Sequence, residues 1–409
     1  MDYKRFITPL LMVAALVSCS TGKQGLTLEA KDEKPTGNVE AAYIKEGEEK
    51  KLPFWGGLFT QVCNESQKEN VCISPLSAQL ALSMTAVGAT GETQQQMYST
   101  INLTGDVNAA AKETIKELAD SRYECEVSIA NSIWINEILD VKKSFIDTNK
   151  EYYNALVTTA PFNRETLLAI NSWCSDNTKG KIKDALSDIK ENDRMYLINA
   201  LYFKGAWNNK FDAGNTKEKP FTKEDGSRVD VSMMNQTIKT QYYEDDFVQV
   251  TIKRFTYRYQ MLLVLPAEGV KTADAIAHFS ENYERILNEM STYEVTLYMP
   301  KFQCEFGASL KEQLKRMGMP RAFGKDAQFD GISDEQLYVD DIFQKTFIKV
   351  DEIGAEAAAI TVLRTGLLAA NRKPEKRTMN LDRPFMYLIT DYKPENILFI
   401  GKIGNPNEQ

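Results

Sequence analysis

The sequence predicts an α+β fold, in which helices and strands occupy separate stretches of the chain. Three observations support this prediction. Apolar residues recur at helical spacing through most of the first half, strand-type runs follow from Met195 onward, and a segment of nearly thirty residues near the C-terminus joins two of these strands. Strands and helices do not alternate as they do in a parallel α/β sheet.

The early helices are marked by their apolar spacing and by residues typical of helix ends. Ser74 and Pro75 fit an N-terminus, with serine as the cap and proline at the first helical position. Gly88 and Gly91 end that helix, and Thr93 begins another. The predicted helices are Leu52–Val62, Pro75–Ala86, Ala109–Leu118, one that ends near Tyr153, and Ala169–Thr178.

The strands are marked by short runs of β-branched, aromatic and apolar residues. Tyr196–Phe203 is almost continuously apolar, which is typical of a strand buried on both faces. The other predicted strands are Val127–Ile135, Val248–Ile252, Tyr259–Leu265, Tyr293–Met299, Thr346–Val350, Phe385–Ile389 and Ile397–Ile403.

The segment 350–379 is the most unusual part of the chain. A connection of this length inside a compact domain is normally either functional or disordered. Its composition is not that of a disordered tail, because Asp351 and Glu352 lead into Gly354, a block of small residues and several larger apolar ones, before a basic, Pro-containing end. The block consists of Ala355, Glu356, Ala357, Ala358 and Ala359.

This segment fits two interpretations. Its Ala, Glu and Leu residues favour a surface helix. As a strand, it would separate into a small apolar face and a second face that carries both charges and could stay wet. The first face would hold Ala355, Ala357, Ala359, Thr361 and Leu363, and the second Glu356, Ala358, Ile360, Val362 and Arg364. A loop that is able to become a buried strand is expected to have this pattern.

The composition limits the class of protein. With 43% hydrophobic and 26% charged residues, the 409-residue chain has the make-up of a soluble globular protein of one large domain or two ordinary ones. Its formal charge of −8 argues against a nucleic-acid partner, which normally requires a basic face.

The N-terminus reads as an export signal. Lys4 and Arg5 precede an apolar run that is too short to span a membrane and that ends at Cys19. The pattern resembles the bacterial lipobox, whose cysteine is lipidated and becomes the mature N-terminus; the alternative is an ordinary signal peptide with a chance cysteine. We expect a signal peptide over 1–18, a flexible tether over 19–50 and a folded domain over 51–409. The protein would then be exported and anchored by lipid to a bacterial cell envelope, facing either the periplasm or the outside.

The residues that catalysis and metal binding need do not form usable patterns. His278 is the only histidine, and its surroundings indicate a helix surface or boundary. Besides Cys19, the cysteines match no zinc spacing and read as mostly buried thiols, with a disulfide pair left open; they are Cys63, Cys72, Cys125, Cys174 and Cys304. Motifs for hydrolases, metalloproteases and nucleotide binding are absent. We therefore expect no catalytic residue, metal or cofactor, although a carboxylate-pair enzyme would leave no local signature.

Several stretches resemble the serpins, in that family's own order. Residues 70–97 (NVCISPLSAQLALSMTAVGATGETQQQM) are similar to the helix B region. Further similar stretches are Ile170-Asn171-x-Trp173 with residues 178–182, 199–211 (NALYFKGAWNNKF), 262–266, 295–302 (VTLYMPKF) and 398–406. No single motif decides the matter, but their order from about residue 50 to 409 identifies the chain as a member of this family.

The resemblance implies a fold with three β-sheets, about nine helices and an exposed reactive loop over about 352–379. It also implies a mechanism: a target endopeptidase attacks the loop, is held as a covalent 1:1 acyl-enzyme, and is carried along as the cleaved loop inserts into sheet A. The hinge residues would be Glu352, Gly354, Ala355, Glu356, Ala357, Ala358, Ala359 and Thr361. The shutter and breach, which control opening of the sheet, would include Ser74, Ser77, Asn199, Trp207 and Gln344. A monomer that is itself no enzyme is expected.

By family spacing, the scissile bond lies fourteen residues beyond Gly354, at Leu368-Ala369. A leucine there suits chymotrypsin-like, elastase-like or subtilisin-like serine proteases. Arg364, Arg372 and Lys373 offer alternative sites to trypsin-like proteases. A non-inhibitory serpin that acts only as a binding protein is the competing function.

The chain departs from the family pattern at a few places. Ala355 stands where Thr or Ser is common, and Ile360 stands where alanine is usual. Gln344 replaces a histidine that bonds the asparagine corresponding to Asn199; because glutamine both donates and accepts, we expect the shutter to survive. The segment after the scissile bond is about five residues longer than in well-known animal serpins.

Overall fold

The structure, a computed structural model, describes residues 52–408 except 120–124, 257, 356–373, 392, 394 and 395. The described helices are α1 (Phe54–Glu65), α2 (Pro75–Ala86), α3 (Gly91–Thr100), α4 (Val107–Leu118), α5 (Lys143–Tyr153), α6 (Arg164–Asn177), α7 (Thr272–Glu289) and α8 (Lys311–Arg316). Two short 3₁₀ helices are η1 (Ala213–Asn215) and η2 (Pro320–Phe323). The strands are β1 (Val71–Ile73), β2 (Glu126–Asn136), β3 (Leu156–Ala160), β4 (Met195–Ala206), β5 (Lys217–Thr222), β6 (Arg228–Glu244), β7 (Val248–Arg254), β8 (Gln260–Pro266), β9 (Ser291–Pro300), β10 (Phe302–Ser309), β11 (Phe343–Val350), β12 (Gly354–Ala355), β13 (Lys376–Asn380), β14 (Phe385–Thr390) and β15 (Ile397–Ile403).

The strands form two hydrogen-bonded sheets. One has six strands in the order β10-β11-β12-β4-β2-β3, and the other runs β1-β15-β14-β8-β7-β6-β9-β13, with β5 paired to β6. The resemblance implied three sheets. The difference comes from β6, whose seventeen residues pair with β5 and β9 and then with β7, so that two of the three sheets are continuous. The α+β class is confirmed.

Capping residues explain where several helices begin. Ser74 accepts a hydrogen bond from Ser77 N (3.2 Å), and α2 begins and ends where the sequence predicts. Helix α6 begins five residues earlier than predicted, at Arg164 rather than Ala169, because Asn163 caps it by accepting from Glu165 N and Thr166 N. A cap of this kind satisfies amides that the first helical turn leaves without partners.

The prediction that Tyr196–Phe203 is buried on both faces is correct only in part. Ala200–Phe203 is buried, but Met195–Asn199 is half-buried. Tyr196 and Ile198 pack beside a small apolar cluster of Trp134, Phe162 and Ile170 under α6, which is separate from the main core. The apolar run therefore predicted β4 correctly, but at the start of this strand only a few side chains cover one of its faces.

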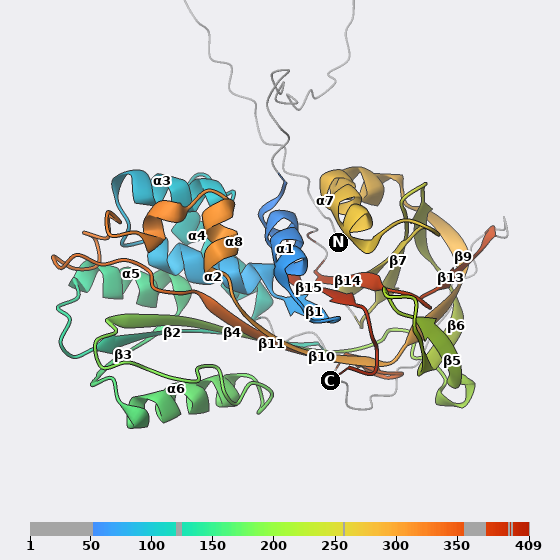
Figure 1. Ribbon diagram of the computed structural model, residues 1–409, viewed down its shortest axis with the longest axis horizontal. Coiled ribbons are helices and arrows are strands. Elements are labelled where there is room, and N and C mark those ends of the chain that lie inside the picture. Colours follow the sequence, from blue (N-terminus) through green and yellow to red (C-terminus); the bar gives the residue numbers. More distant parts are fainter. Residues whose placement is uncertain are drawn as a thin grey trace, which may run out of the picture. The chain divides into compact units, whose positions relative to one another are not determined.

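Helices cover the six-stranded sheet unequally on its two faces. In Figure 1, α2, α3, α4, α5 and α8 lie on one side of β2, β4 and β11, and α6 lies alone on the other. The large core lies on the first side and continues between α1, α7 and the nine-stranded sheet. One thin cluster thus holds α6 against the sheet.

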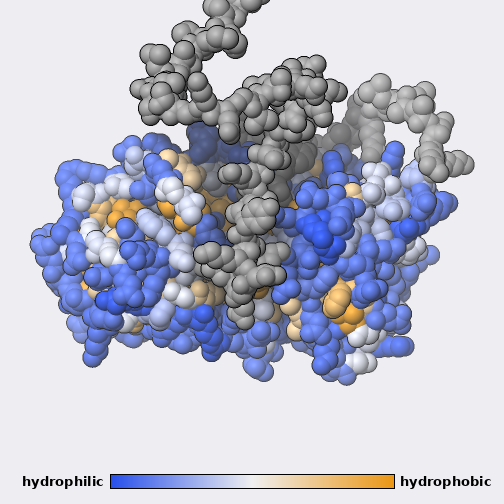
Figure 2. All heavy atoms as spheres, turned by 90° about the horizontal axis from the view of Figure 1, so that it is seen from above, coloured by the Kyte–Doolittle hydropathy of each residue, from blue (hydrophilic) through white to orange (hydrophobic). Residues whose placement is uncertain are grey.

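The surface agrees with the composition. Figure 2 shows a mostly hydrophilic face with small apolar areas. Within the described ranges, the large apolar side chains that are exposed are Ile138, Leu156, Leu168, Phe247, Tyr338 and Phe343. None of the helices in those ranges is long and apolar enough to cross a membrane.

The thin cluster under α6 makes a clear stability prediction. Ile170→Ala removes a fully buried side chain, and we expect the free energy of unfolding to fall by about 2–5 kcal/mol in urea denaturation. Leu168→Ala, on the same helix but 58% exposed, is the matched control and should change it by less than about 0.5 kcal/mol. Equal losses in the two variants would show that helix propensity, rather than the cluster, holds α6.

Candidate functional site

The first hinge residues already form a strand inside the six-stranded sheet. β12 consists of Gly354 and Ala355 and lies between β11 and β4. Ala355 pairs with Val350 on one side and Gly205 on the other, and Gly354 pairs with Ala206. The side chain of Ala355 is completely buried. A small side chain at this position fits, since the neighbouring residue is glycine.

Beyond Ala355, the two flanking strands have no strand between them among the described residues. β11 pairs with β10, and β4 with β2, on their other edges. No direct pair between β11 and β4 occurs in the described part of the sheet. Each strand therefore presents a row of backbone groups to the position that a continued β12 would fill, and such an edge accepts an added strand.

The residues before β12 are held by the segment that follows β4. Trp207 N donates to Ile353 O (2.8 Å), Trp207 Nε1 donates to Asp351 O (2.9 Å), and Phe211 N donates to Glu352 O (3.0 Å). Of the predicted breach residues, Trp207 thus contacts the hinge directly. Phe211 was missed by the sequence reasoning, because a backbone N–H donor leaves no residue-specific signal.

Glu352 is fixed by its side chain as well. Its carboxylate accepts from Thr216 Oγ1 (2.8 Å) and pairs with Lys301 Nζ (3.1 Å). Burial by itself would raise the pKa of Glu352, but hydrogen bonds from its own backbone, Thr216 and Lys301 hold that pKa below its usual range. Glu352 is therefore ionised. It is anchored to Lys301, which lies between β9 and β10, and to Thr216, which follows η1. Lys301 and Thr216 are further residues that sequence reasoning did not single out.

Three of the predicted shutter residues are joined by hydrogen bonds, Ser74 with both Ser77 and Gln344. Gln344 brackets the backbone of Ser74, accepting from Ser74 N (2.9 Å) and donating to Ser74 O (2.8 Å). Asn199 instead donates to Asn131 Oδ1 (2.7 Å), its register partner on β2. Among the described residues, Gln344 therefore bonds Ser74 rather than Asn199, and survival of the shutter as a whole stays a prediction. A primary amide matches the donor and acceptor of one peptide group, and Ser74 offers both.

This arrangement leaves one polar atom of the shutter without a partner. The side-chain oxygen of Asn199 is buried and accepts no hydrogen bond from the described residues. It lies on β4, at the edge that faces β11 across the space beyond Ala355. A buried acceptor of this kind favours any donor that enters the space.

Most of the predicted loop residues lie outside the described residues. These are Glu356, Ala357, Ala358, Ala359, Thr361, Arg364, Leu368, Ala369, Arg372 and Lys373. Cys19 is outside them too. The described chain resumes at Pro374, and β13 pairs in parallel with β9. Arg377 holds β13 by pairing with Glu244 (3.2 Å) and by lying over the Tyr293 ring (4.5 Å).

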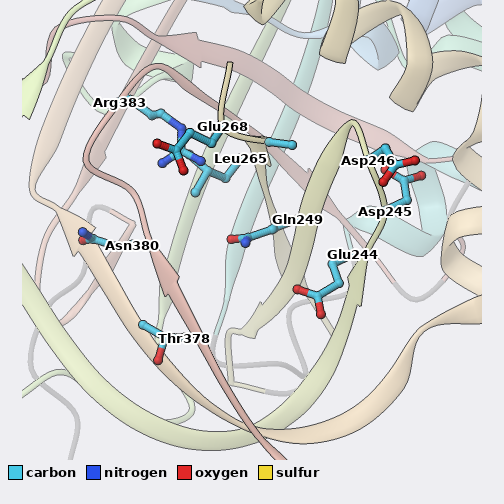
Figure 3. A pocket seen from close by; sticks show the side chains of 10 residues that line it. Glu244, Asp245, Asp246, Gln249, Leu265, Glu268, Thr378, Asn380 and Arg383 are labelled. Carbon is cyan, nitrogen blue, oxygen red and sulfur yellow. The ribbon is translucent and has the colours of Figure 1, made fainter. Parts of the chain in front are cut away.

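A polar pocket of about 550 Å³ borders the strand that follows the loop. Figure 3 shows Thr378 and Asn380 of β13 on one side, Glu244 of β6 on the other, and Gln249 between them. The rest of the lining is Asp245, Asp246, Leu265, Ala267, Glu268 and Arg383. Arg383 donates to Pro266 O (2.7 Å) and to Asp382 (3.1 Å), so this wall is fixed by charged groups.

The single histidine has a structural place beside this pocket. His278 on α7 lies 2.8 Å from Asp245 and stacks on Phe247 (ring centroids 4.3 Å apart). Burial alone would raise the pKa of Asp245, but hydrogen bonds from Tyr243, the amides of Val248 and Phe247, and His278 bring that pKa to about 2. The prediction that His278 lies on an amphipathic helix, at the boundary between surface and core, is confirmed.

The cysteines other than Cys19 are free thiols. Cys63 is partly exposed, and Cys72, Cys125, Cys174 and Cys304 are buried, as the sequence predicted. Burial raises the pKa of Cys72 to about 11 and that of Cys174 to about 12. Protonated, buried thiols act as small apolar core residues rather than as nucleophiles.

Comparison with known proteins agrees with this geometry. The family model for serpin (serine protease inhibitor) matches residues 53–406. An uncharacterized serpin-like protein of Thermococcus kodakarensis is 32% identical over 381 residues, which cover 89% of this chain and 88% of that protein. Antithrombin-III of Mus musculus is 32% identical over 364 residues, or 84% and 78% of the two chains.

Solved structures show the same fold. Tengpin, a thermophilic serpin in its native state, matches with a TM-score of 0.77 and 32% identity over 87% of this chain and 93% of tengpin. A thyroxine-binding globulin complex with thyroxine matches with a TM-score of 0.77 and 28% identity over 88% and 98% of the two chains. The family model covers most of the chain, and the chain belongs to the serpin family.

Proposed function

We propose that this protein is a single-use inhibitor of endopeptidases, chiefly serine proteases, which it traps by inserting its cleaved loop between β4 and β11. The observation that carries the proposal is β12, which starts a strand between two edges that are unpaired beyond it in the described part of the sheet. The target protease supplies the catalytic serine and forms the acyl bond. The inhibitor therefore needs no catalytic residue, metal or cofactor of its own.

The register of β12 fixes where each later loop residue would go. Continued from the pairs Ala355–Gly205 and Ala355–Val350, it brings Ala357 between Phe203 and Ile348. Ala359 follows between Leu201 and Thr346, and all four flanking residues are buried. Thr361 then comes between Asn199 and Gln344, where its hydroxyl could donate to the unpartnered oxygen of Asn199. The small inward face predicted from the sequence thus meets the buried side of the sheet.

Charge favours the same register on the opposite face. Glu356 would come between Lys204 and Lys349, and Lys345 lies four residues from Lys349 along β11, on the same face. Directly opposite and diagonal cross-strand neighbours of opposite charge stabilise a sheet by a few tenths to about 1 kcal/mol each. Attraction between Glu356 and these lysines would therefore favour entry of the first loop residues into the sheet.

Insertion is expected to be strongly favourable overall. About a dozen residues would gain backbone hydrogen bonds on both sides, at about 0.5–1.5 kcal/mol each, before the cost of ordering the loop is subtracted. The uncleaved protein would then be a kinetically trapped state. Insertion competes with hydrolysis of the acyl bond, which is why the hinge residues before the cut matter.

Leu368-Ala369 is the bond we propose for cleavage, with Arg364, Arg372 and Lys373 as alternatives for trypsin-like enzymes. A cut at Arg364 would leave a shorter insert, and one near Arg372 a longer one. Only one insert length can carry the protease to a given position, so the bond used decides the outcome.

The direct test mixes the protein lacking residues 1–19 with chymotrypsin, an elastase, subtilisin or trypsin in separate reactions. We expect a covalent complex that resists denaturing electrophoresis, because the acyl bond survives when the protease is trapped. Mass spectrometry of the released C-terminal fragment should show that it begins at Ala369. A catalytically inactive serine-to-alanine protease is the control and should give no such band.

Cleavage by every protease without any complex would contradict this function and favour the second candidate, a non-inhibitory binding protein. Ile360 and Gln344 are the departures that favour it, and the similar thyroxine-binding globulin shows that a chain of this fold binds a small molecule. Melting temperature separates the two further, since an inserting serpin should melt far higher once its loop is cut.

The projected register predicts different effects from two neighbouring substitutions. Ala359→Glu would bury a carboxylate between Leu201 and Thr346, so it should block insertion and turn the inhibitor into a substrate. Ala358→Glu, the matched control, would place the same charge diagonal to Lys204, Lys345 and Lys349. The ratio of trapped to released protease on gels should fall at least about tenfold in the first variant only. Equal loss in both variants would rule out this register.

We also propose that Cys19 carries a lipid that anchors the protein to the bacterial cell envelope. The proposal rests on the charged, apolar and small-residue pattern that ends at Cys19. Cys19→Ala should move the protein from the membrane fraction to the soluble one in cell fractionation, because the lipid has no attachment site. Continued membrane association of this variant, with Cys63→Ala as the control, would contradict lipidation.

A further inference from the structure

A buried lysine lies directly beneath the segment that holds the hinge. Lys253, at the end of β7, is 1% exposed. Its ammonium group lies 4.4 Å from the centre of the Phe211 ring and 5.3 Å from that of Trp207. It also donates a hydrogen bond to Asn209 O. All three of these groups belong to the same five-residue stretch, 207–211.

Further contacts fix this stretch against β7. Gln236, with its amide oxygen turned to the ammonium, accepts from Lys253 and donates to Lys210 O at 3.2 Å. Asn208 N donates to Arg254 O (3.0 Å), and Trp207 stacks on Phe255 (ring centroids 4.2 Å apart). The 207–211 stretch is therefore seated on β7 and its extension, with Lys253 at the centre of the contact.

The opposite side of the stretch holds the hinge. Trp207 N, Trp207 Nε1 and Phe211 N donate to the carbonyls of three successive residues, 351–353, immediately before β12. The residues that enclose Lys253 are thus the same residues that grip the start of the loop.

The chemistry of a buried ammonium group explains why Lys253 would fix residues 207–211 in one position. An apolar side chain at position 253 would fill the same space without requiring partners in any particular direction. An ammonium group in a low-dielectric site instead requires carbonyl acceptors and aromatic faces at fixed positions. Movement of residues 207–211 would take those groups away, so the charge holds the stretch in one conformation.

We propose that Lys253 is a positioning residue for loop insertion: it fixes residues 207–211 so that their N–H groups hold residues 351–353 at the entrance between β4 and β11. This inference rests on the proposed inhibitory function. Lys253 would help the cleaved loop to insert before the acyl bond is hydrolysed. It would have no part in recognition of the protease.

The test compares Lys253→Met with Lys239→Met, an exposed lysine on β6. Methionine keeps most of the length and the apolar stem of the lysine side chain. For Lys253→Met we expect the number of inhibitor molecules consumed per protease trapped to rise about fivefold or more, with an unchanged association rate. Trp207→Phe, which removes the indole donor to Asp351 O, should raise it too, and the double variant should be less than additive.

A second measurement needs no protease. Amide hydrogen exchange of the uncleaved protein should be faster at Trp207, Phe211 and residues 353–355 in Lys253→Met, and unchanged in Lys239→Met. If the wild-type protein traps no protease, the inhibitory function fails, and faster exchange would still establish the hinge contact. Unchanged exchange and unchanged consumption in a folded Lys253→Met protein would overturn the proposal and leave Lys253 as a core residue only.

Discussion

Backbone hydrogen bonding along the facing edges of β4 and β11 is the interaction on which the rest of this structure depends. β4 and β11 each have a neighbour on one side, and between them only Gly354 and Ala355 are paired in the described residues. Peptide groups that lie inside a protein without partners are costly, so the loop insertion that we propose would be favoured by pairing along both edges. The surrounding residues hold β4, β11 and β12 in place.

Three sets of contacts do this from different directions. Lys301 and Thr216 anchor Glu352. The 207–211 stretch, seated on Lys253, holds residues 351–353. Lower in the sheet, Gln344 ties β11 to the N-terminus of α2, and Asn199 ties β4 to β2. These contacts join β4 and β11 to different supports: β4 to β2, and β11 to the N-terminus of α2.

The sequence predicted what depends on local patterns and missed what depends on long-range pairing. The limits of α2 and β15 followed from a cap and from an apolar run, and both are confirmed. β5 and β6 were not predicted, because their many polar residues carry little apolar signal; β6 is ordered by pairing with distant β9, and β5 by pairing with β6. Periodicity separated the two faces of the loop, and the resemblance named Glu352 and Trp207, but Lys301, Lys253 and Asn131 reach the site from remote strands. No spacing in the sequence relates them to residue 352.

The position of β14 and β15 determines whether the two fragments stay together after the loop is cleaved. β14 and β15 lie inside the nine-stranded sheet, each paired on both edges, and almost every residue in them is buried. A chain severed in the loop would therefore remain a non-covalent heterodimer of two fragments, the smaller one held like any interior pair of strands. Religation would be blocked as well, because insertion would carry one new end far from the other. If the cleaved loop inserts as we propose, one peptide bond separates two states of the molecule, and return from the cleaved state to the intact one is blocked.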